Sequence, residues 1–171
     1  MNPELQKIRP LVVDDSGLMC ALIHGILRAV GVGPVTTAQN GAEALEILAT
    51  ADPAPNILFV DWEMEPMSGI ELTRAIRRAP EGSKIDPYIP IIMVTAHTEM
   101  DKVLEARDAG IHEYLVKPIT GRALLARLTE VINHPRPFIR TEAYVGPAPR
   151  RDRAGPAEDW EEVAIDDSVA L

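Results

Sequence analysis

The stretch Ile57-Leu58-Phe59-Val60-Asp61-Trp62-Glu63-Met64 decides the fold, because four apolar residues run directly into a carboxylate. An apolar run of this length predicts a strand that is buried on both faces, as in a parallel sheet covered by helices. A carboxylate that follows such a strand lies in the crevice at the carboxyl end of the sheet, where open α/β proteins bind their ligands. The interpretation therefore depends on whether other strands bring matching groups to the same edge.

Similar apolar runs occur on both sides of this stretch. They predict strands at residues 11–13, 35–38, 57–60, 91–94 and 114–116. Apolar residues at helical spacing predict intervening helices at residues 17–30, 41–51, 69–79, 100–109 and 120–132. Alternating strands and helices imply a parallel sheet with right-handed crossovers and helices on both faces. We therefore predict a flavodoxin-like (βα)5 doubly wound sheet with strand order 2-1-3-4-5.

The composition limits the classes of protein to which the chain can belong. Its 171 residues indicate one domain with an addition, and a net charge of −9 argues against bulk binding of nucleic acid. The single cysteine, Cys20, cannot form an internal disulfide and falls on a predicted helix, where it is expected to be a small core residue. No apolar run reaches membrane-spanning length, and residues 1–10 do not resemble a signal peptide. The expected compartment is the cytoplasm.

Polar side chains follow four of the predicted strands. Asp14 and Asp15 follow the first strand, Asp61 the third, Thr95 the fourth and Lys117 the fifth. In a parallel sheet these positions share one edge, and carboxylates about 5 Å apart would repel by roughly 3 kcal/mol per pair at an effective dielectric of about 20. Mg²⁺ relieves such repulsion and prefers oxygen ligands. A carboxylate nucleophile beside Mg²⁺, an ammonium group and a hydroxyl has what phosphoryl transfer requires.

With these groups in this order, the chain resembles the receiver domain of two-component response regulators, the CheY-like family. The resemblance covers approximately residues 8–133. The segments that carry it are Val12-Val13-Asp14-Asp15-Ser16, Asp61-Trp62-Glu63-Met64, Met67-Ser68-Gly69, Val94-Thr95-Ala96 and Tyr114-Leu115-Val116-Lys117-Pro118. The chain departs from the family in one loop, where Glu65 occupies the usual place of a proline and Pro66 follows.

The resemblance implies a role for each residue at this edge. Asp61 would be the phosphoacceptor, and Mg²⁺ would be bound by Asp14, Asp15, Asp61 and the backbone carbonyl of Glu63. The Lys117–Pro118 peptide is expected to be cis, an isomer that is common only before proline.

The resemblance also implies how the site would signal. Thr95 would be the switch hydroxyl, Lys117 the phosphate-binding lysine and Tyr114 the switch aromatic residue. Glu63 and His97 lie two residues beyond Asp61 and Thr95 and are expected to tune the lifetime of the acyl phosphate.

The implied function is that of a single-domain response regulator. A histidine kinase or phosphotransfer protein would phosphorylate the domain at residues 1–133, which would signal to an unidentified downstream protein through its fourth helix, fifth strand and fifth helix. We expect no DNA-binding output module and no enzymatic activity beyond slow self-dephosphorylation.

Residues 134–171 form a predicted extension that is flexible or lies on the domain surface. It is basic up to Arg153, with five arginines against two acids, and then acidic, with six acids and no basic residue. Guanidinium groups bind phosphates and stack on purines. A small anionic dinucleotide is therefore a possible ligand, and the arginine pattern is similar to that of some cyclic di-GMP receptors, including a CheY-like subgroup with an arginine-rich C-terminal extension. This resemblance implies an alternative function as a CheY-like cyclic di-GMP effector. The arginines that would bind the dinucleotide are Arg136, Arg140, Arg150 and Arg151.

A more remote alternative is a phosphohydrolase of the haloacid-dehalogenase type, which also uses an aspartate nucleophile at a strand end. Such an enzyme would want a second aspartate two residues later as its general acid, and this chain has Glu63 there. The chain also lacks the lid domain that such enzymes often insert.

Overall fold

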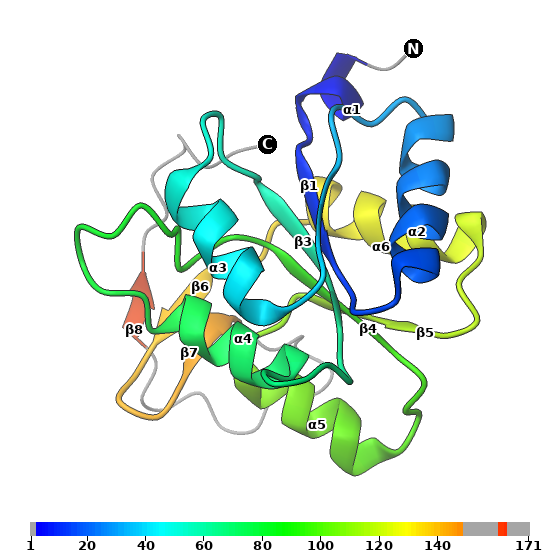
Figure 1. Cartoon of the computed structure of the whole chain (residues 1–171). Helices are drawn as coiled ribbons and strands as arrows, with labels where there is room; N and C mark the ends of the chain where they lie inside the picture. The colour runs from blue at the N-terminus through cyan, green and yellow to red at the C-terminus, as the bar shows by residue number, and fades with distance from the viewer. Residues whose placement is uncertain (1–2, 149–160, 164–171) are drawn as a thin grey trace.

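A computed structural model describes residues 3–148 and 161–163 (Figure 1). Five parallel strands form the main sheet in the order β2-β1-β3-β4-β5, which confirms the predicted topology. The strands are β1 (Pro10–Val13), β2 (Thr36–Ala38), β3 (Ile57–Asp61), β4 (Ile91–Thr95) and β5 (Glu113–Val116). The helices are α1 (Pro3–Lys7), α2 (Gly17–Ala29), α3 (Gly41–Thr50), α4 (Gly69–Arg77), α5 (Met100–Ala109) and α6 (Gly121–Asn133). In the described part of the chain, no helix is both long and apolar enough to span a membrane.

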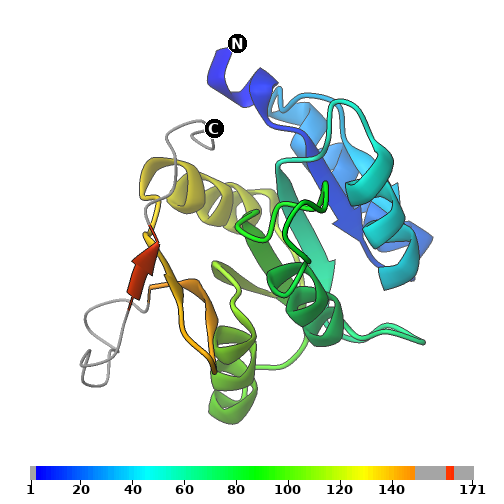
Figure 2. The same cartoon turned by 90° about the vertical axis from the view of Figure 1, so that its left-hand side faces the viewer.

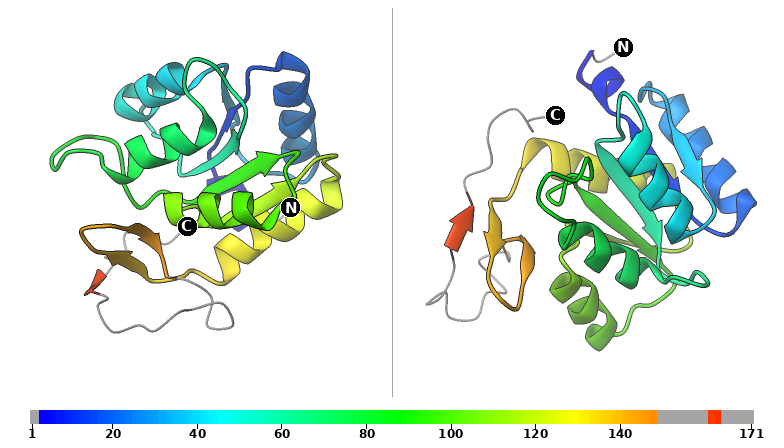
Figure 3. Two further views of the ribbon diagram at one scale, coloured as in Figure 1. Left: turned by 90° about the horizontal axis from the view of Figure 1, so that it is seen from below. Right: turned by 60° about the vertical axis from the view of Figure 1, so that its left-hand side comes forward.

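Helices cover both faces of this sheet, as Figures 2 and 3 show. On one face, Leu58 and Val60 of β3 pack with apolar side chains of α3, α4 and α5. On the other face, Phe59 packs with side chains of α2 and α6. All of β3 is buried, so the apolar run at residues 57–60 is enclosed on both sides as predicted.

The helices begin where the sequence provides capping side chains. Ser16, Asn40, Ser68 and Thr120 each accept a hydrogen bond from a backbone N–H in the first turn of the helix that follows. Ser68 completes a capping box with Glu71, whose carboxylate accepts the Ser68 N–H. The short helix α1 was not predicted from the sequence, because five residues are too few to show a helical period.

Only some of the apolar residues of α2 face the core. Cys20, Ile23 and Leu27 are buried against the sheet, whereas Leu18 is 83% exposed and Leu22 is 43% exposed. The helix has more apolar residues than one contact stripe can use, so sequence spacing alone does not show which of them face the core.

The C-terminal extension contains regular structure that the sequence did not predict. Strands β6 (Phe138–Arg140) and β7 (Val145–Pro147) pair as an antiparallel hairpin, and the backbone of β8 (Glu161–Val163) pairs with the other edge of β6. We call residues 138–147 the C-terminal hairpin. Phe138 and Ile139 are buried. The described part of the extension therefore packs on the domain and is not an irregular tail.

The C-terminal hairpin (orange in Figures 2 and 3) lies beside the end of α5. Gly110 ends α5 in the left-handed region with φ 97°, which favours glycine. A Cβ atom at Gly110 would also overlap the carbonyl oxygen of Val145 in β7. Both the turn and the close approach of β7 therefore require glycine at this position.

A fully buried arginine lies beneath the C-terminal hairpin. The Arg77 guanidinium donates hydrogen bonds to the carbonyls of Gly110 (2.9 Å), Pro87 (2.7 Å) and Ile89 (2.9 Å). The ring of Phe138 covers it, with 5.1 Å between the guanidinium carbon and the ring centre. Burial lowers the pKa of Arg77 to about 9, so the group remains charged at neutral pH. Arg77 thus joins α4, the loop before β4 and the hairpin.

His112 connects Arg77 and Phe138 to the main sheet. Its Nδ1 atom accepts the Ile91 N–H at 3.2 Å, and its ring lies 5.4 Å from that of Phe138. Burial, together with the charges of Arg77 and Arg136, lowers the pKa of His112 well below 6.5. The imidazole is therefore neutral in the folded protein at neutral pH.

We expect this neutral histidine to make folding less favourable in mild acid. Below about pH 6.5 His112 binds a proton in the unfolded chain but not in the folded state, so the free energy of unfolding falls as the pH falls. Urea unfolding at several pH values should show that the wild type loses roughly 1 kcal/mol more between pH 7 and 5.5 than His112→Gln does. Parallel pH curves for the two proteins would contradict this assignment.

Candidate functional site

The carboxyl ends of four strands bring the predicted residues together. Asp61 is the last residue of β3 and Thr95 the last of β4, whereas Asp14 and Lys117 immediately follow β1 and β5. Asp14, Asp61 and Thr95 are buried, Lys117 is half-buried, and Asp15 is exposed. The edge therefore presents three carboxylates, a hydroxyl and an ammonium group, as the strand ends predict.

The loop after β3 folds back tightly over the end of that strand. The Gly69 N–H donates to the carbonyl of Trp62 at 2.9 Å. A Cβ atom at Gly69 would overlap the carbonyl oxygen of Asp61. Glycine at the start of α4 therefore allows the helix to pack directly against the residue that carries the central carboxylate.

Three carboxylates form a compact cluster. One oxygen from each of Asp14, Asp15 and Asp61 can be chosen so that all lie within 4.8 Å of one another. Asp14 Oδ1 accepts the Ser16 N–H at 2.8 Å, but Asp14 Oδ2 is buried and has no hydrogen-bond donor within the described residues. A buried carboxylate oxygen without a donor in an all-oxygen cluster fits a hard divalent cation such as Mg²⁺.

The electrostatics of the cluster support the same fit. Burial raises the pKa of Asp61, and the nearby charge of Asp14 raises it further, although the hydrogen bond from Lys117 acts in the opposite direction. Burial likewise raises the pKa of Asp14. Packing these carboxylates together thus disfavours their ionisation, and a bound cation would reverse that effect.

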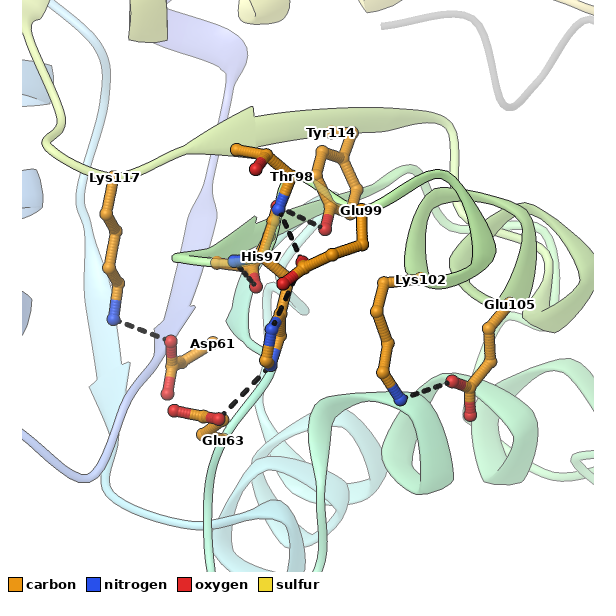
Figure 4. Close-up of polar contacts among 10 residues, drawn as sticks. Asp61, Glu63, His97, Thr98, Glu99, Lys102, Glu105, Tyr114 and Lys117 are labelled. Carbon is orange, nitrogen blue, oxygen red and sulfur yellow. Dashed lines mark hydrogen bonds and ion pairs between the residues drawn. The ribbon is translucent and has the colours of Figure 1, made fainter.

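Lys117 supplies the positive charge at this edge, as Figure 4 shows. Its Nζ atom lies 2.7 Å from Asp61 Oδ1 and 3.7 Å from Asp14 Oδ2. Burial alone would lower the pKa of Lys117, but the hydrogen bond and charge of Asp61 outweigh burial, so the pKa is raised. The Lys117–Pro118 peptide is cis, as predicted.

The hydroxyl and the aromatic residue meet through the segment after β4. Thr95 Oγ1 accepts the backbone N–H of His97 at 3.0 Å. The Tyr114 hydroxyl donates to the His97 carbonyl at 2.8 Å. Thr95 and Tyr114 therefore contact the same backbone segment, which leads directly into α5.

His97 lies between two glutamates at the rim of the site (Figure 4). Its Nε2 atom is 3.1 Å from Glu63 Oε1, and its Nδ1 atom is 3.6 Å from Glu99 Oε2. The sequence predicted a role for Glu63 and His97 but not for Glu99. No sequence pattern marks Glu99, because it belongs to a polar segment between β4 and α5 whose path only the fold determines.

Of the candidate dinucleotide-binding arginines, the two that the structure describes do not join this edge. Arg136 donates hydrogen bonds to the carbonyls of His112 and Ala148, so it lies at the opposite end of β5 from Lys117. Arg140 is exposed at the end of β6. Arg150 and Arg151 lie outside the described residues.

We expect Mg²⁺ to stabilise the fold through the carboxylate cluster. At a hundredfold excess over its dissociation constant, a ligand that binds only the folded state adds about 2.7 kcal/mol to the free energy of unfolding. Thermal or urea unfolding in MgCl₂ and in EDTA measures this gain, and Asp14→Asn should lose more than half of it. Asp108→Asn, at an exposed aspartate in the last turn of α5, should keep the full gain. An equal loss in both variants would count against a metal site at the cluster.

Comparisons with known proteins identify a family model, relatives and a solved structure that match most of this chain. Residues 11–129 match a family model described as response regulator receiver domain. The chain is 36% identical over 121 residues to the chemotaxis protein CheY of Pseudomonas aeruginosa, covering 71% of this chain and 93% of that protein. It is 37% identical over 123 residues to CheY1 of Helicobacter pylori, covering 71% and 94%. The solved structure of Vibrio cholerae CheY4 matches with a TM-score of 0.65 at 31% identity, covering 72% of this chain and 98% of that one.

Proposed function

Because the chain belongs to the family of response regulator receiver domains, we propose that it accepts a phosphoryl group on Asp61 within a two-component phosphorelay. The observation that carries the proposal is the placement of the Asp61 carboxylate. It lies beside two further aspartates and 2.7 Å from the Lys117 ammonium group. The reaction would take place in the cytoplasm, the compartment expected from the sequence.

The chemistry follows from these positions. The donor would be a phosphohistidine on a histidine kinase or a phosphotransfer protein. An Asp61 carboxylate oxygen attacks phosphorus, the phosphorus–nitrogen bond breaks, and the imidazole leaves with its electron pair and takes up a proton. Mg²⁺, held by Asp14, Asp15, Asp61 and the Glu63 backbone carbonyl, would neutralise charge on the phosphoryl oxygens. The Lys117 ammonium group now contacts the Asp61 carboxylate, and after the transfer it would form an ion pair with the phosphoryl group instead.

Signalling would pass from the acyl phosphate to one face of the domain. Thr95 would turn toward the phosphoryl group, and the shared His97 backbone would couple that movement to Tyr114 and α5. The proposed signalling face comprises α5, β5 and α6, and its exposed apolar side chains include Met100, Leu104 and Val116. A downstream protein would bind there, and chemotaxis partners are the first to test because the relatives are named as chemotaxis proteins.

Receivers of this family act as phosphoacceptors rather than as enzymes that turn over a separate substrate. We propose that this chain has at most slow self-dephosphorylation. Glu63 and His97, joined at 3.1 Å at the rim of the site, would set the rate at which water reaches the acyl phosphate.

We propose that the receiver comprises residues 1–133 and the extension residues 134–171. Binding of cyclic di-GMP through Arg136, Arg140, Arg150 and Arg151 is the second candidate function. Arg136 donates to two backbone carbonyls that hold the extension on the domain, so a dinucleotide would have to compete with those bonds. The geometry thus favours the phosphoacceptor function. Calorimetry with each arginine changed to alanine tests the alternative.

A pull-down tests the proposed signalling directly. Beryllofluoride mimics a phosphoryl group on the acceptor carboxylate, so protein treated with it should retain a downstream partner from a native lysate. Untreated protein and treated Asp61→Asn should not retain that partner. If all three samples retain the same proteins, the interaction does not depend on phosphorylation and the signalling proposal fails.

A further inference from the structure

A hollow of about 390 Å³ opens between the C-terminal ends of α4 and α5 and the turn of the C-terminal hairpin. Its charged and aromatic lining residues are Arg74, Arg77, Arg78, Asp108, Glu142 and Tyr144. The receiver fold supplies the walls formed by α4 and α5, whereas the extension supplies the third wall. This volume lies within the range of small-molecule sites in proteins.

The wall formed by α4 carries surplus positive charge. Arg74 lies in the last turn of α4 and Arg78 caps its end; both are exposed, four residues apart, and line the hollow. Neither has an ion pair in the part of the chain that the structure describes. Like charges four residues apart at a helix end repel each other, and an anion bound between them would relieve that repulsion.

The acidic residues of the hollow do not neutralise this wall. Asp108 Oδ1 lies 2.7 Å from the Arg107 guanidinium, so its charge is already balanced by a residue outside the lining. Glu142 stands alone against three arginines. The third of these, Arg77, is buried, and the lower polarity of its surroundings strengthens the effect of its charge.

The hairpin wall is held in place and offers an aromatic surface. The Tyr144 hydroxyl donates to the Pro147 carbonyl at 2.8 Å, and its N–H donates to Thr141 Oγ1 at 2.9 Å. The ring therefore has a defined position in the wall of the hollow that the hairpin forms. A hollow lined by a fixed aromatic ring and by a pair of exposed arginines suits a ligand with an anionic end and a flat or apolar body.

We propose that this hollow binds a small phosphorylated molecule, with its phosphate held between Arg74 and Arg78 and its body against Tyr144. Guanidinium groups bind phosphate oxygens through paired hydrogen bonds, which favours phosphate over a simple halide. The site is separate from Asp61, because it lies at the C-terminal ends of α4 and α5 whereas Asp61 adjoins the N-terminal end of α4. Occupancy would join α4 to the C-terminal hairpin and steady the end of α5, which belongs to the signalling face.

Amide NMR of the full-length protein, titrated with inorganic phosphate and with pyrophosphate at constant ionic strength, tests the proposal. Signals of Arg74, Arg78 and residues 142–145 should shift and saturate, while an equal ionic strength of chloride should not produce that response. Changing Arg74 and Arg78 together to glutamine should weaken binding at least about tenfold. The matched control Arg122→Gln, at an exposed arginine of α6, should bind as the wild type does.

Two further measurements separate this site from the phosphorylation site. Asp61→Asn should leave the response at residues 142–145 unchanged. Binding at the hollow can therefore be judged even if Asp61 proves not to be the phosphoacceptor. Glu142→Gln should tighten binding, because it removes a carboxylate that repels the anion. Shifts confined to the surroundings of Asp61, or equal binding by the double arginine variant and the wild type, would overturn the proposal.

Discussion

Asp61→Asn is expected to abolish phosphorylation completely. In the wild type, incubation with acetyl phosphate and Mg²⁺ should add the mass of one phosphoryl group to the intact chain. An amide at position 61 is a poor nucleophile and cannot form the acyl phosphate, although it has nearly the same shape as the carboxylate. Intact-protein mass spectrometry before and after EDTA quenching measures the fraction of modified chains.

The matched control is Glu63→Gln, which makes the same chemical change two residues away. Glu63 is exposed, and its side chain contacts His97 rather than Lys117. This variant should still be modified, with an altered rate of phosphoryl loss. Modification of Asp61→Asn to the wild-type level would place the acceptor elsewhere and remove the basis of the proposed function.

Arg77→Ala should produce the largest loss of stability of any single change considered for this chain. It removes three hydrogen bonds to backbone carbonyls, leaves those carbonyls buried without donors, and empties the space under Phe138. We expect the free energy of unfolding to fall by about 3 kcal/mol or more, as measured by urea unfolding. The loss should appear with and without Mg²⁺, because Arg77 does not contact the carboxylate cluster.

Arg74→Ala provides the control on the same helix, one turn earlier. Arg74 is exposed and has no described ion pair, so its removal should change stability by less than about 0.5 kcal/mol. Comparable losses in the two variants would mean that the buried bonds of Arg77 contribute little beyond the side-chain volume.

The central fold could be predicted because each level of the sequence pointed to the same answer. The run at residues 57–60 is too apolar for a strand with one solvent-exposed face. Segments with apolar residues at helical spacing lie between it and the preceding and following strands. Strand ends then place Asp14, Asp61, Thr95 and Lys117 on one edge without any knowledge of side-chain geometry. The separations between these residues in the chain are large, but the parallel topology alone brings them together.

Other features depend on tertiary contacts that no local pattern encodes. In the sequence Arg77 is a polar residue near a helix end, and its burial depends on the loop before β4, on Gly110 and on Phe138, all of which are distant in the chain. The hairpin itself has short strands among prolines and glycines, so its periodicity is too brief to recognise.

The contact between Gly110 and Val145 restricts which receiver domains could carry this extension. An insertion or a larger residue at the end of α5 would push the hairpin away, and that displacement would expose the Arg77 guanidinium group and the Phe138 ring to water. The extension is thus not an appendage that could be exchanged freely between relatives. A chimera that joins this extension to another receiver should fold well only if that receiver also supplies the glycine and the buried arginine.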